Sequence, residues 1–536
     1  MPAASSPTPH ETAARSETIV QANDNCWRID RADRFSCVQD AADYFRLVRH
    51  AFLHARERIF ILGWDIQSTL DLVPGGASDG APTRLDELLK WVIRRRPQLT
   101  CHVLTWDYAE LYALEREPLA AWRWKWQMPK QVRFAFDDRH PIGASHHQKI
   151  IVVDDVLAFC GGIDLTGHRW DTAAHRVDEP LRVNATGSPY DPYHEVQAMV
   201  CGPVAASLGT LVRSRWQALG ETLPPVAPAS LGGLWPDDLE PDLTDIDVAI
   251  ARTVPPSETE PAIRECERLF VDSIAAARQS IYIESQYFTN DALARALAAR
   301  LQEPEGPEII VVIPKECHGW IEQQTMGALR DEALRHLITS DRWRRLRVVY
   351  PAASRARDVC TFIHSKVMIV DDRFVRIGSA NFSRRSMGVD SECDLAIDAG
   401  SDSAHRAGVR RIRDRLIGEH LGVSADAVAD QLRHSGSFRA LIDAHAHTDR
   451  TLCGVDLGEP IEPPSEALKA AADPDEPLGV FVDSRYRRAR KRMRSLGAAL
   501  RSLLPSHLSS SSRSSSSRSS SWSSSSGQRR RDAEFG

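Results

Sequence analysis

The chain has 536 residues, more than one hydrophobic core normally organises, so two or more domains are expected. Its apolar fraction of 42% and charged fraction of 26% are typical of a soluble globular protein. The net charge of −6 at pH 7 excludes a molecule that binds polyanions through an overall positive charge, so any basic surface must be local. Its 10 cysteines follow neither metal-ligand nor paired spacing, which predicts reduced and mostly buried thiols.

The first residues, 1–25, predict a disordered leader, because they are rich in Ala, Ser, Thr and Pro and lack the apolar stretch of a secretory signal. No apolar run along the chain approaches the roughly 18 residues that a membrane-spanning helix requires. We therefore expect a cytoplasmic or peripheral membrane protein without a signal peptide or transmembrane helix. Export by a route that needs no N-terminal signal stays open.

Two long segments, 26–230 and 248–422, share one order of predicted elements. In each, an amphipathic helix leads into a short strand of β-branched and aromatic residues, and two further strands follow. The helices are 41–55 and 265–277; the strands are 56–65, 99–104 and 132–136, then 278–287, 308–313 and 347–350. Alternating helices and strands predict an α/β fold in each half, and the shared order indicates a tandem duplication.

Three stretches lie outside these repeats. A Pro-, Gly- and Asp-rich stretch, 231–247, predicts a linker, and 423–483 predicts a helical and loop extension. Residues 484–536 predict a disordered tail, which is basic at 485–501 and almost entirely Ser at 509–526. The basic part has hydrophobic residues at roughly helical spacing, which fits a helix on an anionic lipid surface as well as a solvated tail.

Each repeat contains the same pattern of His, Lys and Asp. The first copy consists of His147, Lys149 and, after four further residues, Asp154, and the second consists of His364, Lys366 and Asp371 at the same spacing. Seven residues past each Asp a turn of small residues begins, at 161–164 and at 378–381. A duplicated His, Lys and Asp at fixed spacing is the pattern that a two-histidine phosphodiester-cleaving site would need.

In a strand, residues i and i+2 face the same side, so the His and the Lys of each motif project together. The aliphatic stretches that follow, 150–153 and 367–370, are typical of strands buried on both faces. A buried strand that presents an imidazole and an ammonium at its end is a rigid site for an anion. The glycines of the following turns allow short polar side chains to come close to that anion. The predicted phosphate-binding residues are Ser379, Asn381 and Asp164.

Two copies of the motif supply the groups that cleavage of a phosphodiester without a metal requires. One neutral imidazole attacks phosphorus and forms a phosphohistidine. The other, as imidazolium, protonates the leaving alcohol, which typically contributes about 10²–10⁴ in rate. Two lysines and an asparagine stabilise the negative charge of the phosphate. We therefore expect neither a metal nor another cofactor in this reaction.

The predicted catalytic residues are His147, Lys149, Asp154, His364, Lys366 and Asp371. Within this set, the two aspartates are expected to fix local turns rather than to touch substrate. Each histidine also needs an acidic partner on its other ring nitrogen. Glu195 and Glu392, which occupy matching places after the two motifs, are the predicted partners.

The two motifs resemble those of the phospholipase D superfamily, whose signature is H-x-K-x4-D followed by a G-S-x-N or G-G-x-[ND] turn. The resemblance covers roughly 35–422 and points to bacterial phospholipase D-like and cardiolipin synthase-like enzymes. It implies two tandem α-β-α sandwich repeats that form one bilobal unit with a single active site at their interface. It also implies attack by His147, with His364 as the acid and then as the base. Two departures are Asp164, where many members have Asn, and His168, which interrupts the usual Gly-Arg-Trp.

The resemblance implies hydrolysis of glycerophospholipids to phosphatidic acid and a head-group alcohol, by a monomer at a membrane surface. Phosphatidyl transfer of the cardiolipin synthase type uses the same residues and stays an alternative. A nuclease is less favoured, and no nucleic-acid partner is expected, because no basic patch with interleaved aromatic residues lies near the motifs. The intact His and Lys of both motifs disfavour a non-catalytic scaffold. Residues 122–126, where Trp alternates with Arg and Lys, fit an interfacial segment or ordinary packing.

Overall fold

The computed structural model describes one compact unit of the chain. The described residues are 18–107, 122–184, 186–226, 230–257, 260–317 and 323–458, together with 465, 469–470 and 472–477. The compact unit is Met1–Val480, and a second unit, Phe481–Gly536, lies outside the described residues. The predicted tail with its basic stretch therefore lies outside them, as do residues 1–17 of the predicted leader. Among the described residues, no helix combines the length and the apolar character that crossing a bilayer requires.

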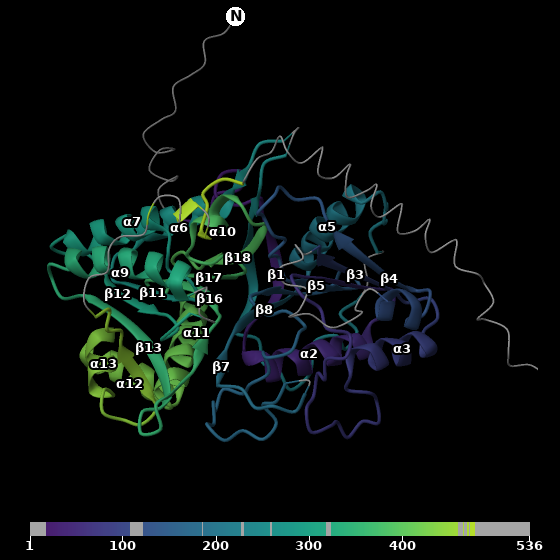
Figure 1. Cartoon of the computed structure of the whole chain (residues 1–536), viewed down its shortest axis with the longest axis horizontal. Coiled ribbons are helices and arrows are strands. Elements are labelled where there is room, and N and C mark those ends of the chain that lie inside the picture. The colour runs from purple at the N-terminus through teal and green to yellow at the C-terminus, as the bar shows by residue number, and fades with distance from the viewer. Residues whose placement is uncertain are drawn as a thin grey trace, which may run out of the picture. The chain divides into compact units, whose positions relative to one another are not determined.

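The first repeat is a seven-stranded sheet covered by helices on both faces (Figure 1). In sheet order its strands are β4 (Val132–Asp137), β3 (Thr100–Trp106), β2 (Arg58–Gly63), β5 (Ile150–Val153), β6 (Leu157–Gly161), β8 (Val196–Cys201) and β1 (Arg28–Gln39). Helix α5 (Pro203–Ala218) packs on one face, and α2 (Asp40–His54) and α3 (Leu85–Arg95) pack on the other. Alternation along β5 separates the faces, because Ile150 and Val152 join the first core while Ile151 and Val153 join the second.

The second repeat has the same arrangement. In sheet order its strands are β9 (Leu243–Val254), β18 (Glu392–Asp398), β17 (Phe374–Gly378), β16 (Lys366–Val370), β11 (Ser280–Ser285), β12 (Glu308–Val312) and β13 (Leu346–Ser354). Helices α6 (Glu265–Ala276), α7 (Asp291–Gln302) and α9 (Ala328–Ser340) cover one face, and α11 (Ser403–Leu421) covers the other. The prediction of an α/β fold made of two tandem sandwich repeats is confirmed.

Short elements connect this framework. They are β7 (Tyr193–His194), β10 (Ile263–Arg264), β14 (Val359–Cys360), β15 (Phe362–Ile363), β19 (Thr451–Gly454), α10 (Arg384–Gly388), α12 (Ala425–Ser435), α13 (Phe438–Ala444) and two π-helical turns, η2 (Arg123–Gln127) and η3 (Gln323–Gly327). The two π-helical turns occupy matching places in the repeats, after β3 and after β12.

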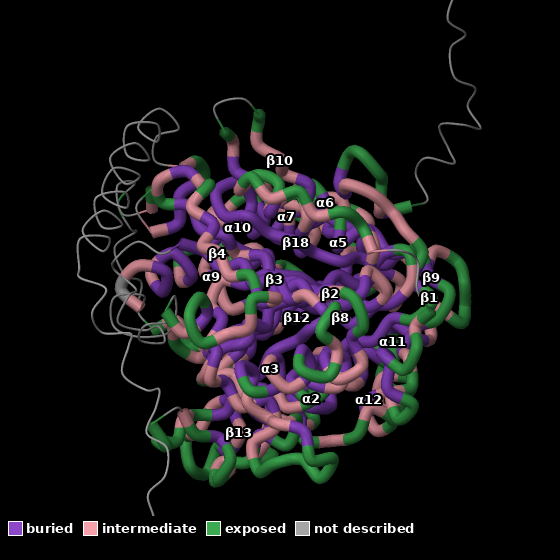
Figure 2. The backbone as a smooth tube through the Cα atoms, turned by 90° about the vertical axis from the view of Figure 1, so that its right-hand side faces the viewer, coloured by how far each residue is buried: buried purple, intermediate pink, exposed green. Residues whose placement is uncertain are grey.

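Strands β1 and β9 join the repeats into one mixed sheet, because they pair antiparallel from Arg28↔Ile250 to Phe35↔Leu243. Both strands lie at the middle of the sheet, and β8 and β18 flank them. One hydrophobic core contains residues of α5 from the first repeat and of α11 from the second. Buried backbone accordingly continues through the centre of the molecule rather than stopping at the boundary between the repeats (Figure 2).

Three predicted boundaries are corrected by the structure. Residues 243–247 of the predicted linker already belong to β9, where Leu243 and Ile246 are buried and the aspartates that suggested a loop are exposed. In the predicted leader, Ile19 donates its N–H to Asp398 at 2.7 Å, so residues 18–25 are packed rather than disordered. The extension, 423–483, contributes a strand as well as helices and loops, since β19 pairs with β13.

The two motif aspartates close the turns that precede β2 and β11. The carboxylate of Asp154 accepts three backbone N–H groups at 2.7–2.8 Å, those of Arg56, Glu57 and Arg58. The carboxylate of Asp371 accepts the matching three at 2.6–2.9 Å, those of Arg278, Gln279 and Ser280. Each Asp follows its strand, whereas the motif His precedes that strand. The prediction that Asp154 and Asp371 are catalytic residues is therefore corrected. The expectation that they fix local turns rather than touch substrate agrees with these contacts.

Replacing Asp154 by Ala should lower the free energy of unfolding by about 2–4 kcal/mol, because three backbone donors lose a charged acceptor. Thermal unfolding of the variant measures this loss. Asp238→Ala is the matched control, since the Asp238 side chain is 72% exposed and its loss should change stability by less than about 0.5 kcal/mol. Equal melting temperatures for the two variants would contradict the assigned role.

Candidate active site

The two motif histidines lie where the repeats meet, at corresponding ends of β5 and β16. The backbone N–H of His147 donates to the carbonyl of Ser391 at 3.0 Å, and that of His364 donates to the carbonyl of His194 at 2.9 Å. Each acceptor belongs to the other repeat and directly precedes one of the predicted glutamates. The main chain therefore fixes each histidine against the opposite repeat.

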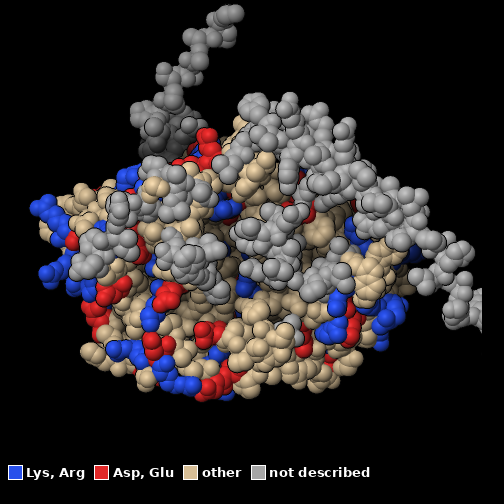
Figure 3. All heavy atoms as spheres, in the orientation of Figure 1, with Lys and Arg blue, Asp and Glu red and all other residues tan. Residues whose placement is uncertain are grey.

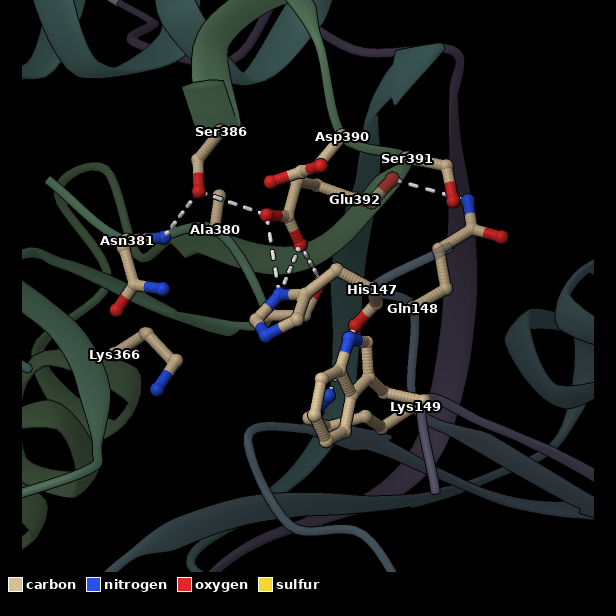
Figure 4. Close-up of polar contacts among 12 residues, drawn as sticks. His147, Gln148, Lys149, Lys366, Ala380, Asn381, Ser386, Asp390, Ser391 and Glu392 are labelled. Carbon is tan, nitrogen blue, oxygen red and sulfur yellow. Dashed lines mark hydrogen bonds and ion pairs between the residues drawn. The ribbon is translucent and has the colours of Figure 1, made fainter. Parts of the chain in front are cut away.

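Each motif histidine contacts the predicted glutamate of the other repeat, so the two acidic partners are exchanged between the repeats. His147 Nδ1 lies 3.0 Å from Glu392 Oε2, and His364 Nδ1 contacts Glu195 Oε2 (Figure 4 shows the first pair). Both carboxylates are fully buried. A carboxylate on Nδ1 keeps the proton there and directs Nε2 of each ring away from its partner. The sequence identified both glutamates, but the exchange follows from the pairing of the sheets.

Two serine hydroxyls hold Glu392 in place. Ser379 Oγ donates to Glu392 Oε2, and Ser386 Oγ donates to Glu392 Oε1 at 2.8 Å. The prediction that Ser379 binds phosphate is therefore corrected, because its hydroxyl is engaged with the carboxylate that orients His147. Sequence reasoning missed Ser386. The repeat gave no signal for it, since Arg169 stands at the corresponding place in the first copy.

Lys149 is paired with a carboxylate, and Lys366 is held by backbone. Lys149 Nζ lies 3.0 Å from Asp164 Oδ2 and donates to the carbonyl of His147 at 3.2 Å. Asp164 also accepts the N–H of Trp64 at 2.8 Å. An ionised carboxylate offers acceptors alone and repels a phosphate. The prediction that Asp164 binds phosphate is therefore corrected to a role in positioning Lys149. Lys366 Nζ donates to the carbonyl of His364.

Asn381 is the predicted phosphate ligand whose side chain stays available. Its backbone N–H donates to Ser386 Oγ at 3.1 Å, while its buried Oδ1 has no hydrogen-bond partner within the described part of the chain. Figure 4 places its amide beside the Lys366 side chain and on the side toward which the His147 ring extends. A buried polar atom without a partner is rare in a folded protein and costs stability. Oδ1 can accept a hydrogen bond from a ligand, whereas a phosphate oxygen would be bound by the Nδ2–H donors of the same amide.

Both imidazoles lie in one positive electrostatic environment. Burial lowers the pKa of His147 well below its usual value, and Lys149 and Lys366 lower it further. Burial likewise lowers the pKa of His364, together with Lys366, Arg169, Lys149 and His147 itself. Lysines of both repeats therefore lower the pKa of each ring, and His147 contributes to the lowering at His364. The lowered pKa values favour the neutral form of both imidazoles at pH 7.

Two charged groups near the rings, Lys366 and Glu195, have pKa values close to neutral pH. Burial lowers the pKa of Lys366 to about 7, an effect that Glu195 partly offsets. Burial raises the pKa of Glu195 to about 7, an effect that Lys366 and Arg169 partly offset. Perturbed values of this kind are concentrated at functional sites. Among the described residues, the groups of His and acidic side chains close enough to share a cation include neither motif histidine.

Comparisons with known proteins find relatives of the phospholipase D type. The sequence model for "Cardiolipin synthase, PLD-like domain" matches 270–407, which contains the second motif. Phospholipase D alpha 1 of Vigna unguiculata is 23% identical over 519 residues and aligns with 70% of this chain. The second repeat therefore matches a phospholipase D-like family model, and both repeats fall in a region that is similar to curated phospholipases D. Phospholipase D A of Dictyostelium discoideum is 24% identical over 462 residues, covering 72% of this chain and 35% of that protein.

The chain spans 63% of the length of the Vigna relative. A solved structure, the phosphatidylserine synthase of Haemophilus influenzae, has the same fold with a TM-score of 0.50 at 15% identity. That match covers 82% of this chain and 98% of the synthase chain. The fold of this chain is therefore similar to that of the solved synthase.

Both motif histidines should titrate below pH 6.5 in the ligand-free protein, because their pKa values are lowered by burial and by the lysines. Lowered values keep the rings neutral at pH 7 and protonate them only as the pH falls. NMR of protein labelled at the histidine ring carbons measures the midpoints, and His147→Gln and His364→Gln assign the two signals. A midpoint above 6.5 for either ring would contradict the shared positive environment.

Proposed function

We propose that this chain is a phosphodiesterase of the phospholipase D type that hydrolyses glycerophospholipids to phosphatidic acid and a head-group alcohol. The observation that carries the proposal is the exchanged pairing of two imidazoles with two glutamates, set among lysines that act on both rings. Attack on a phosphodiester requires a neutral nucleophile, a proton donor for the leaving group and cations that stabilise the charge on the phosphate.

In the first step, Nε2 of His147 attacks phosphorus while Nδ1–H donates to Glu392. The new P–N bond forms as the P–O bond to the head group breaks, and His364 gives its ring proton to the departing oxygen. The ligand-free His364 is neutral, so it must gain this proton as substrate binds. An anionic phosphodiester between the rings raises the pKa of an adjacent imidazole, because an opposite charge favours the protonated form.

In the second step, His364 is neutral and accepts a proton from water. The water oxygen attacks phosphorus, the P–N bond breaks, and His147 returns to its starting form with phosphatidic acid as the product. Lys149, Lys366 and the Asn381 amide face the phosphate oxygens in both steps and stabilise the charge that accumulates there. An alcohol in place of water gives phosphatidyl transfer with the same residues.

The π-helical turn η2 supports a membrane surface as the place of action. Trp122 and Trp126 are 49% and 78% exposed, and Lys125 between them is exposed as well. The central Trp124 is buried and stacks on Phe134 with ring centroids 5.7 Å apart, so ordinary packing accounts for this residue and the interfacial interpretation concerns Trp122 and Trp126. Exposed Trp beside cations is typical of side chains that sit at a bilayer interface. Acidic and basic side chains are interspersed over the described part of the face shown in Figure 3, so this visible surface has no large basic patch that would bind a polyanion.

The first test offers mixed liposomes of phosphatidylcholine and phosphatidylethanolamine to the full chain. Choline or ethanolamine should be released together with phosphatidic acid, and His147→Ala should reduce turnover by about 10³-fold or more because the nucleophile is lost. His405→Gln is the control, since its side chain is 24% exposed and pairs with Asp402 on the surface.

The products decide between hydrolysis and transfer. The second candidate, a phosphatidyl transferase, is favoured by the cardiolipin synthase description of the matching family. With phosphatidylglycerol as donor and glycerol or a second phosphatidylglycerol as acceptor, cardiolipin detected by mass spectrometry would establish transfer. No head-group release and no transfer from any of these lipids would contradict the proposal, and plasmid nicking in EDTA would then indicate a nuclease.

A further inference from the structure

Four ligand-type side chains are buried together between the repeats, outside the phosphate site. They are Asp40 at the start of α2, His175 in the loop before β7, His194 in β7 and Glu419 near the end of α11. One ligand atom of each lies within 4.8 Å of the others. His194 Nδ1 is 2.6 Å from Glu419 Oε1 and 3.2 Å from Asp40 Oδ1, and His175 Nε2 is 2.9 Å from Glu419 Oε1.

Each of these imidazoles has a carboxylate on its opposite nitrogen. His175 Nδ1 lies 2.9 Å from Asp171 Oδ2, and His194 Nε2 lies 3.0 Å from Glu284 Oε2. Arg182 holds Asp171 from behind at 3.0 Å. Histidines that bind a metal almost always donate their other N–H to such a partner, which fixes the tautomer and the orientation of the ring. The cluster therefore has both the ligand set and the surrounding carboxylates of a metal centre.

Asp40 carries an oxygen that points into the cluster without a hydrogen-bond partner. Oδ2 of Asp40 is buried and has none within the described part of the chain, and it lies 3.8 Å from His175 Nε2. The residue is 1% exposed, and its backbone has a φ of +60°, which non-glycine residues rarely adopt. Strained backbone and an orphaned buried oxygen persist only where the surroundings or a ligand compensate for them.

We propose that Asp40, His175, His194 and Glu419 form a closed site for one divalent transition-metal ion, with Zn²⁺ as the best match. Two imidazoles and two carboxylates suit Zn²⁺, and four protein ligands are typical of structural sites. Tetrahedral bonds of about 2.0–2.2 Å place ligand atoms about 3.3–3.6 Å apart. The four contacts between an imidazole nitrogen and a carboxylate oxygen, 2.6–3.8 Å, bracket that value, and one ligand atom of each residue lies within 4.8 Å of the others. The expectation that catalysis needs no metal concerns the phosphate site and is unaffected.

The site would position the second catalytic histidine. The N–H of Asp40 donates to the carbonyl of Glu195 at 2.8 Å, and the N–H of Glu195 donates to Asp40 Oδ1 at 3.2 Å. The carbonyl of His194 accepts the N–H of His364. An ion bound by Asp40 and His194 would therefore fix the backbone of Glu195 through Asp40 and the backbone of His364 through His194. Glu419 also lines a surface cavity of about 550 Å³.

The direct experiment measures metal in the full chain. Protein treated with a chelator, exposed to Zn²⁺ and dialysed should retain about one Zn²⁺ per chain by mass spectrometry of the metal, and its melting temperature should rise above that of the stripped protein. These readouts are independent of turnover, so failure of the proposed lipid chemistry would leave them unchanged. No retained Zn²⁺ and no shift in melting temperature would overturn the proposal.

Variants locate the ion. Asp40→Asn and His175→Gln should abolish retention of Zn²⁺, whereas Glu284→Gln should weaken affinity by about 10–100-fold because it removes only the partner of a ligand. His405→Gln, in the exposed pair with Asp402, should retain the ion fully. Binding that persists in both ligand variants would place the ion elsewhere and overturn the assignment. If a ligand variant fails to fold, competition of wild-type protein against a chromophoric chelator still decides, since no measurable affinity would overturn the proposal.

Discussion

The site depends on one constraint, which is that each catalytic imidazole is held by the opposite repeat. Backbone hydrogen bonds from His147 to Ser391 and from His364 to His194 cross the interface, and the Nδ1 contacts to Glu392 and Glu195 cross it as well. Neither repeat can orient its own histidine alone. Antiparallel pairing of β1 with β9 joins the two sheets and makes this exchange possible. Duplication therefore supplies a complete site through its interface.

The exchanged pairs are similar in topology and different in chemistry. Glu392 accepts hydroxyls from Ser379 and Ser386, whereas in the first repeat Gly162 and Arg169 stand at those places. A Cβ at Gly162 would lie 2.2 Å from Glu195 Oε1, so the glycine makes room for that carboxylate. Glu392 is thus held by two hydroxyls, whereas Glu195 lies beside Lys366 and Arg169. This difference gives the two histidines different surroundings, as different roles in one reaction require.

Sequence predicted the fold class, the duplication and the residues that meet at the interface, because motif spacing and aliphatic strands are local features. It did not predict which glutamate contacts which histidine, since that depends on sheet pairing between segments 245 residues apart for one pair and 169 for the other. Ser379 and Asp164 were assigned to phosphate because short polar side chains in a turn give no sign of their direction. Asp40, His175, His194 and Glu419 lie far apart in sequence, so no spacing pattern indicated that they meet.

The most direct test of a shared site is to trap the covalent intermediate in a His364→Gln variant. A phosphatidyl ester of 4-nitrophenol needs no proton on its leaving group, so the first step should proceed while the second stalls without its base. One equivalent of nitrophenol should appear in a burst, and mass spectrometry of the quenched protein should find the phosphatidyl adduct on His147. An adduct on another residue, or steady turnover without any adduct, would contradict the account in which histidines of both repeats act on one phosphorus atom.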